Sequence, residues 1–243
     1  MDRPTLSAIA HRGVPFANPL APATIDAAIA ALRLPDGARA LDVGCGAGEL
    51  LARLAARHAL RTEGIEPAAE WAETARSHVD VVHEAPFVEV TLEHGVYDLV
   101  CCVAASHAIG SWEESLRALA GLARPDGGLG LVGEGFWQRE PSAGYLERLG
   151  GADADELPLG LDGLEAGARD AGWEVLASAV ALPADWALYE ETLLANGEAE
   201  LAARPDPDLR AWVDAARARC EGEGGQDTMG FALLTLRRPA AAH

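Results

Sequence analysis

Three glycines at alternate positions interrupt an apolar run early in the chain. The run at 40–50 reads ALDVGCGAGEL, and its glycines are Gly44, Gly46 and Gly48. Because glycine has no Cβ, such a turn can be tight and can lie directly against a ligand. About twenty residues further on, a second apolar run ends at Glu66, whose carboxylate can accept hydrogen bonds from both hydroxyls of a ribose. The turn and the acid together predict an adenosine-bearing cofactor.

The spacing of the glycines distinguishes between the adenosine cofactors. A dinucleotide fingerprint has its third glycine where this chain has Glu49, and a carboxylate in the first helical turn would repel a pyrophosphate. A P-loop requires a lysine after its glycines, and the chain contains no lysine. The pattern therefore argues against NAD, FAD and a P-loop.

The D-x-G-x-G-x-G pattern that begins at Asp42 closely resembles motif I of the class I S-adenosylmethionine-dependent methyltransferases. In that family the loop passes under the methionine part of the cofactor, and an acid after the second strand, here Glu66, holds the ribose. The family's acid after the third strand has its nearest match in Glu84, which Ala85 follows. The resemblance implies S-adenosylmethionine as cofactor. The implied cofactor-binding residues are Asp42, Gly44, Cys45, Gly46, Gly48, Glu66, Pro67, Glu84, Ala85 and Ala104.

Strand-like runs alternate with helical runs along the chain, which is typical of an α/β protein with a doubly wound, parallel sheet. The predicted strands are 38–43, 62–65, 79–83, 97–104, 129–133, 174–181 and 229–236. The predicted helices are 23–32, 49–57, 67–77, 112–122, 142–149, 161–171, 184–194 and 207–220. Pro67 suits the first turn of its helix. The family resemblance covers about 38–236 and implies a Rossmann-like, seven-stranded, mostly parallel sheet with an antiparallel last strand.

A single methyltransferase domain over 1–243 is expected, in four parts. These parts are an N-terminal lid and helix at 1–36, a cofactor-binding core at 37–182, a helical insertion on the substrate side at 183–227, and the last strand at 228–238. In many members of the family a segment like the first one folds over the cofactor. Arg12 in this segment could then meet the methionine carboxylate.

Two further motifs extend the resemblance. The turn LARPDGG at 122–128 is similar to the family's L-x-P-G-G turn before the fifth strand, with Asp126 in place of the first glycine. The sequences AASH at 104–107 and GEGFW at 133–137 resemble strand ends in a group of bacterial methyltransferases. This second likeness implies a methyltransferase that acts on a small molecule.

Ligands of open α/β sheets bind beyond the carboxyl ends of the strands, and this rule selects the remaining candidates. His107 is the candidate general base, since imidazole titrates near neutral pH; the alternative is a histidine that only bonds a loop carbonyl. Glu134 could bind an amine or serve as a base, or it could form a structural cap or ion pair. The aromatic candidates either pack in the core or form a cage for a cation. The substrate-binding candidates are His11, Glu134, Phe136, Trp137, Trp186 and Tyr189.

The composition limits the partners. The chain has 38 acidic residues against 19 basic ones, a net charge of −19, which disfavours nucleic acid and anionic membranes. It shows no signal peptide and no apolar stretch long enough to span a bilayer. The four cysteines lack a C-x-x-C motif, and His58, His78, His83, His94 and His243 lack metal-ligand spacing. We therefore expect a cytoplasmic protein without a bound metal.

Three functional hypotheses follow from these observations. The first is an S-adenosylmethionine-dependent methyltransferase for a small molecule. The second is a non-catalytic protein that binds the same cofactor as a sensor or scaffold. The third is a nicotinamide-dependent oxidoreductase, against which the glycine spacing argues.

Overall fold

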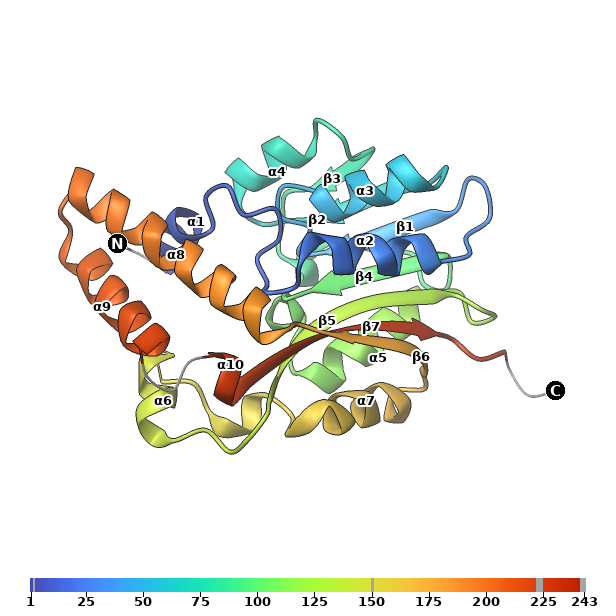
Figure 1. Cartoon of the computed structure of the whole chain (residues 1–243). Helices are drawn as coiled ribbons and strands as arrows, with labels where there is room; N and C mark the ends of the chain where they lie inside the picture. The colour runs from blue at the N-terminus through green and yellow to red at the C-terminus, as the bar shows by residue number, and fades with distance from the viewer. Residues whose placement is uncertain (2, 150, 222–224, 241–243) are drawn as a thin grey trace. The chain divides into compact units, whose positions relative to one another are not determined.

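The computed structural model describes residues 1, 3–149, 151–221 and 225–240 and contains a seven-stranded sheet (Figure 1). The strand order is β3-β2-β1-β4-β5-β7-β6, and β7 runs antiparallel to both of its neighbours. The strands are β1 Arg39–Val43, β2 Arg61–Ile65, β3 Val81–His83, β4 Leu99–Val103, β5 Leu129–Trp137, β6 Glu174–Val180 and β7 Met229–Arg237. The predicted mostly parallel sheet with an antiparallel last strand is confirmed.

Helices precede, connect and follow these strands. The α-helices are α1 Arg3–Ala10, α2 Pro22–Ala31, α3 Glu49–Arg57, α4 Ala69–Ala75, α5 Trp112–Leu122, α6 Ala143–Arg148, α7 Gly160–Asp170, α8 Pro183–Ala203, α9 Pro207–Glu221 and α10 Gly225–Thr228. Three short 3-10 helices are η1 Phe87–Glu89, η2 Ser106–Ala108 and η3 Ala154–Glu156. None of the helices in the described part of the chain is long and apolar enough to cross a membrane.

The chain divides into two compact units. The first, here called the sheet unit, comprises residues 22–134, 162–179 and the chain from 232 onward. In it, α2, α3 and α4 cover one face of the sheet, and α5 and α7 cover the other (Figure 1). Since helices cover both faces, the central strand β4 consists of the apolar residues LVCCV, of which the first four are buried.

The second unit, here called the helical unit, comprises residues 1–21, 135–161 and 180–231. In it, α8 packs against both α1 and α9. Ile9 of α1 meets Leu209 and Val213 of α9 in a small buried core. The N-terminal residues and the segment before the last strand, which are far apart in the sequence, therefore fold together.

Packing explains where the predicted elements differ from the observed ones. Helix α8 runs nine residues beyond the predicted end at Leu194, past Gly197, because that glycine is a point of close approach rather than a break. A Cβ at Gly197 would lie 2.6 Å from the ring of Trp212 on α9. Helix α1, which was not predicted, has only eight residues and is held by the packing of Ile9.

Two boundaries near the predicted binding residues also differ. Strand β5 continues to Trp137, four residues beyond the prediction, because Gly230 leaves room for the ring of Phe136, which would lie 2.2 Å from a Cβ there. The placement of Pro67 in a first helical turn is wrong. Ala68, with an extended backbone, caps α4, and Pro67 precedes it.

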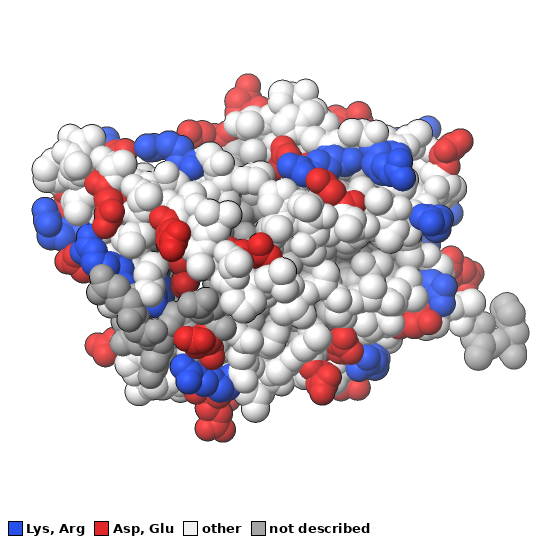
Figure 2. All heavy atoms as spheres, in the orientation of Figure 1, with Lys and Arg blue, Asp and Glu red and all other residues white. Residues whose placement is uncertain are grey.

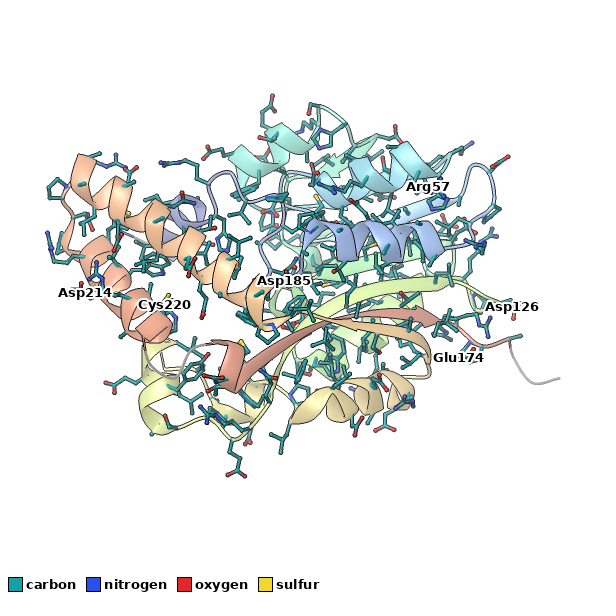
Figure 3. All side chains as sticks on the ribbon, in the orientation of Figure 1. Arg57, Asp126, Glu174, Asp185, Asp214 and Cys220 are labelled. Carbon is teal, nitrogen blue, oxygen red and sulfur yellow. The ribbon has the colours of Figure 1, made fainter. Side chains whose placement is uncertain are left out.

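Acidic side chains and small groups of arginines are interspersed on the face of the molecule shown in Figure 2. The four cysteines are free thiols; Cys45, Cys101 and Cys102 are buried, and Cys220 on α9 is exposed (Figure 3). Within the described residues, no group of three or more His, Cys, Asp or Glu side chains is arranged to hold a metal ion. His243 lies outside the described residues.

Candidate active site

The glycine turn connects β1 to α3 in the sheet unit, and the backbone of β2 fixes its start. The amides of Gly44 and Cys45 both donate to the carbonyl of Ile65, at 2.9 and 3.0 Å. Gly44 has a φ of 74° and Gly48 a φ of 82°, in the left-handed region that favours glycine. The turn is thus built so that its backbone, rather than side chains, faces a ligand.

Steric contact makes Gly44 the most constrained glycine of the turn. A Cβ there would lie 2.4 Å from the Cβ of Ala105, whereas Gly127 has the same backbone conformation with open space around it. We expect Gly44→Ala to lower the free energy of unfolding by about 3 kcal/mol, from backbone strain and overpacking together. Gly127→Ala should cost only the strain, about 1 kcal/mol. Urea denaturation of both variants tests this; equal losses would contradict it.

Glu66 joins the glycine turn to the segment before α4. Its Oε2 accepts a hydrogen bond from the amide of Gly46 at 3.0 Å, and its Oε1 accepts one from the amide of Ala68 at 2.9 Å. Each carboxylate oxygen keeps one lone pair after these bonds. The carboxylate is therefore fixed in orientation and can still accept two hydroxyl donors.

Asp42 is the least satisfied acid of the sheet unit. Its side chain is buried at the end of β1, and its Oδ1 has no hydrogen-bond partner among the described residues. Burial, and secondly the nearby charge of Glu66, raises the pKa of Asp42 to about 7. A buried carboxylate without a partner is costly, so a ligand that brings a cationic or N–H donor group would be stabilised here.

The carboxyl end of β4 carries a strained residue. Ala104 has a φ of 59°, a conformation that non-glycine residues rarely adopt and that is often found at functional sites. After it, Ser106 donates a hydrogen bond to the carboxylate of Glu134 within β5, and Ser115 of α5 donates to the carbonyl of Ser106 at 3.0 Å. These contacts hold the segment after β4 against β5 and α5.

The other sheet-unit candidates lie at the surface or at its margin. His107 is exposed on η2 and has no side-chain hydrogen bond within the described residues. Glu84 is exposed, and its carboxylate pairs with Arg76 at 2.7 Å. Ala85 is half-buried beside it and Pro67 is exposed. If Glu84 binds adenine, its carboxylate must therefore contact both the adenine and Arg76.

The remaining candidates belong to the helical unit, and they form two separate groups there. His11 and Tyr189 share a hydrogen bond of 2.8 Å, and the ring of Trp186 meets Tyr189 edge-on. Phe136 packs on Gly230, while Trp137 donates through its ring nitrogen to the carbonyl of Ala154 at 2.7 Å. Arg12 is exposed and pairs with Glu200. Phe136 and Trp137 therefore make the contacts expected of core residues.

Two residues beside the turn were not predicted, and neither had a sequence signal. His78 contacts the carbonyl of Ala47 through its Nε2 at 2.8 Å and so supports the turn from outside. The ring of Trp71 lies 3.7 Å from where a Cβ of Gly46 would be.

The side chains of the sheet unit fit S-adenosylmethionine. This cofactor carries a sulfonium and an ammonium group, which match the unpartnered, buried carboxylate of Asp42. Its ribose offers two hydroxyls, which match the remaining lone pairs of Glu66. Asp42, Glu66 and the backbone of the glycine turn are the groups that would hold it.

A glycine turn after the first strand of a parallel sheet, with an acid after the second strand, defines an α/β unit that binds a nucleoside cofactor. Comparison with known proteins identifies the class: residues 20–133 match the family described as "Methyltransferase domain". Together with the solved structures described below, this match supports an S-adenosylmethionine-dependent methyltransferase whose cofactor is S-adenosylmethionine. The first of the three hypotheses is thereby favoured over the other two.

Three known proteins illustrate the similarity. The "uncharacterized protein YjhP" of Escherichia coli is 27% identical over 88% of this chain and 89% of its own, and its solved structure superposes with a TM-score of 0.83. A methyltransferase of Thiobacillus denitrificans, solved with S-adenosylhomocysteine, is 26% identical over 97% and 99%, with a TM-score of 0.79. A ubiquinone biosynthesis O-methyltransferase of Neisseria meningitidis is 37% identical, over 37% of this chain and 42% of its own.

Proposed function

We propose that this methyltransferase acts on a small-molecule acceptor rather than on a nucleic acid. The observation that carries the proposal is the charge: 38 acidic residues against 19 basic ones, which opposes the approach of a polyanion. Similarity to an O-methyltransferase of ubiquinone biosynthesis supports a small acceptor. The free thiols support a reducing compartment such as the cytoplasm.

The chain's own residues would hold and orient the reactants. Bound S-adenosylmethionine supplies a methyl group on a sulfonium, which an attacking atom takes up without protonation of the leaving thioether. Asp42 would offset the positive charge, and Glu66 would fix the ribose while it holds the turn at Gly46. Holding the reactants in line is the largest contribution to such a displacement. His107, exposed on η2, is proposed to take a proton from the acceptor.

The predicted roles of the other residues stay part of the proposal. The cofactor-binding set includes Cys45, Gly48, Ala85 and Ala104, all in the sheet unit. Glu134, which Ser106 orients, is proposed to contact the substrate. We further propose that the N-terminal segment 1–36 and the insertion 183–227 provide acceptor specificity within a single functional domain.

Calorimetry and an acceptor screen test the proposed function. We expect the purified chain to bind S-adenosylhomocysteine and to form it from S-adenosylmethionine with at least one member of a panel of phenols, alcohols, amines and thiols. Mass spectrometry detects both products. Transfer RNA and a mixture of soluble proteins serve as alternative acceptors. Methylation of these alone, with none of the small molecules, would contradict the proposal.

A further inference from the structure

A histidine and a tyrosine from distant parts of the sequence form a defined pair in the helical unit. The Nδ1 of His11 lies 2.8 Å from the carbonyl of Ser7, and its Nε2 lies 2.8 Å from the hydroxyl of Tyr189 on α8. A carbonyl can only accept, so Nδ1 carries a proton. Burial lowers the pKa of His11, which favours the neutral ring. In that form Nε2 accepts the hydroxyl proton of Tyr189, whose oxygen still has lone pairs for a further donor.

Helix α8 fixes the backbone on both sides of His11. The side-chain amide of Asn196 donates to the carbonyls of Ala10 and Arg12, at 2.8 and 2.9 Å. One helical turn further on, Glu200 accepts from the Arg12 guanidinium at 3.2 Å. Tyr189, Asn196 and Glu200 are spaced seven and four residues apart, so they lie on one face of α8. The imidazole is therefore held against Tyr189 by a rigid element.

Trp186, one turn before Tyr189, adds a donor to this pair. Its side chain is buried, with 7% exposed, and its Nε1 has no hydrogen-bond partner among the described residues. Its ring meets Tyr189 edge-on, with centroids 6.3 Å apart and an interplanar angle of 79°. Buried indole N–H groups usually have an acceptor, so this N–H is a donor that a ligand oxygen would satisfy.

We propose that Trp186, Tyr189 and His11 form a binding site for the hydroxyl group of a neutral aromatic molecule, a phenol. The ligand oxygen accepts the N–H of Trp186, and the ligand O–H donates to the oxygen of Tyr189. The edge-on aromatic pair provides an apolar wall for the ligand ring. That this ligand is the methyl acceptor rests on the proposed function; the binding site itself does not.

A hydroxyl suits these three side chains better than a cation does. A cation needs aromatic faces, whereas the features that lack partners here are an N–H donor and the lone pairs of a hydroxyl that donates to His11. A phenol is favoured over an aliphatic alcohol because the edge-on rings of Trp186 and Tyr189 can pack against an aromatic ring. Glu190, whose charge acts on Tyr189, would disfavour an already ionised phenolate.

Ligand-observed NMR on the whole chain without cofactor tests the binding site. Phenol, toluene and tetramethylammonium are the probes. We expect phenol to bind about tenfold more tightly than toluene in the native protein, as hydrogen bonds to the polar atoms would give. The Tyr189→Phe and Trp186→Phe variants should reduce this ratio to about twofold or less. Tyr145→Phe, in a separate part of the helical unit, should keep it.

Several results would overturn this assignment. They are equal binding of phenol and toluene, tighter binding of tetramethylammonium than of phenol, and an unchanged ratio in Tyr189→Phe. Affinity for S-adenosylhomocysteine is measured in every variant and should not change. If the native protein does not bind S-adenosylhomocysteine, the proposed function is contradicted, whereas the result for phenol remains valid.

Discussion

Replacing Glu66 by alanine is expected to abolish measurable binding of S-adenosylmethionine. The carboxylate accepts from the amides of Gly46 and Ala68 and offers its remaining lone pairs to the ribose. Hydrogen bonds to a charged group contribute about 1.5–3 kcal/mol each, so the loss of two ribose contacts weakens binding about a hundredfold or more. Release of the Gly46 amide adds to the loss, because the turn is no longer fixed. Calorimetric titration measures the effect.

Two matched variants separate charge and orientation from general damage. Glu66→Gln has the same shape, but its NH2 group would face one of the two amides, so it should bind only slightly better than Glu66→Ala. Glu73→Gln, at an exposed position of α4, removes an acid that pairs with Arg76 and should retain native affinity. Circular dichroism checks that all three variants are folded. Native affinity in folded Glu66→Ala would refute the assignment of this residue.

The cofactor half of the site could be predicted because its determinants are local. The turn from Gly44 to Gly48 follows directly from the end of β1, and strand order brings Glu66 beside it. Parallel pairing of β1 with β2 aligns Val43 with Ile65, so the two motifs meet without any contact that the sequence hides. Local propensity and topology are therefore sufficient here.

The contacts that join distant residues could not be predicted from one sequence. Ser106 and Glu134 are separated by 28 positions, and His11 and Tyr189 by 178. No local spacing records such pairs. His11 and Tyr189 were each expected near the substrate, but their hydrogen bond depends on how α8 packs against α1. Helix α1 itself depends on that packing, since a helix of eight residues is marginal on its own.

Strained and close-packed positions were also hidden. Ala104 has a small side chain like many others in this chain, and nothing in the sequence indicates its positive φ. Gly197 suggests a helix break, yet it lies within α8, where the ring of Trp212 requires a residue without a Cβ. In both places tertiary packing overrides the local preference of the residue. The roles of Ala104 and Glu134 at the site stay predictions.

Replacing Asp42 by asparagine is expected to stabilise the protein without cofactor at alkaline pH and to weaken cofactor binding. The buried carboxyl has a pKa of about 7 in the folded chain, well above its ordinary value of about 3.9. Between these two values the unfolded chain has lost the proton and the folded chain keeps it. Folding stability of the native sequence therefore falls as pH rises from about 4 to 7, by up to about 1.4 kcal/mol per unit from this group.

Asparagine removes that dependence, because it does not titrate. Its own buried amide lacks partners and costs about 1–3 kcal/mol at every pH. At pH 4 the variant should thus be no more stable than the native sequence. At pH 8 it should be more stable by about 2 kcal/mol, since the native carboxylate is then charged and buried. Urea denaturation at both pH values measures the difference in free energy of unfolding between the variant and the native sequence. The same difference at pH 4 and pH 8 would contradict the prediction.

Cofactor affinity should change with pH in the opposite direction to folding stability, which links the buried charge of Asp42 to function. A ligand with a positive charge binds the carboxylate and not the neutral acid, so affinity of the native protein should rise with pH through about 7. Asp42→Asn should bind more weakly at pH 8 and show no such rise.

Sinefungin, which has an amine in place of the sulfonium methyl, and neutral-sulfur S-adenosylhomocysteine separate the two cationic groups. If Asp42 contacts only the sulfonium position, Asp42→Asn should weaken the binding of sinefungin and not that of S-adenosylhomocysteine. If Asp42 contacts the ammonium group, the variant should bind both ligands more weakly. Equal, pH-independent affinity in both proteins would show that Asp42 meets neither group.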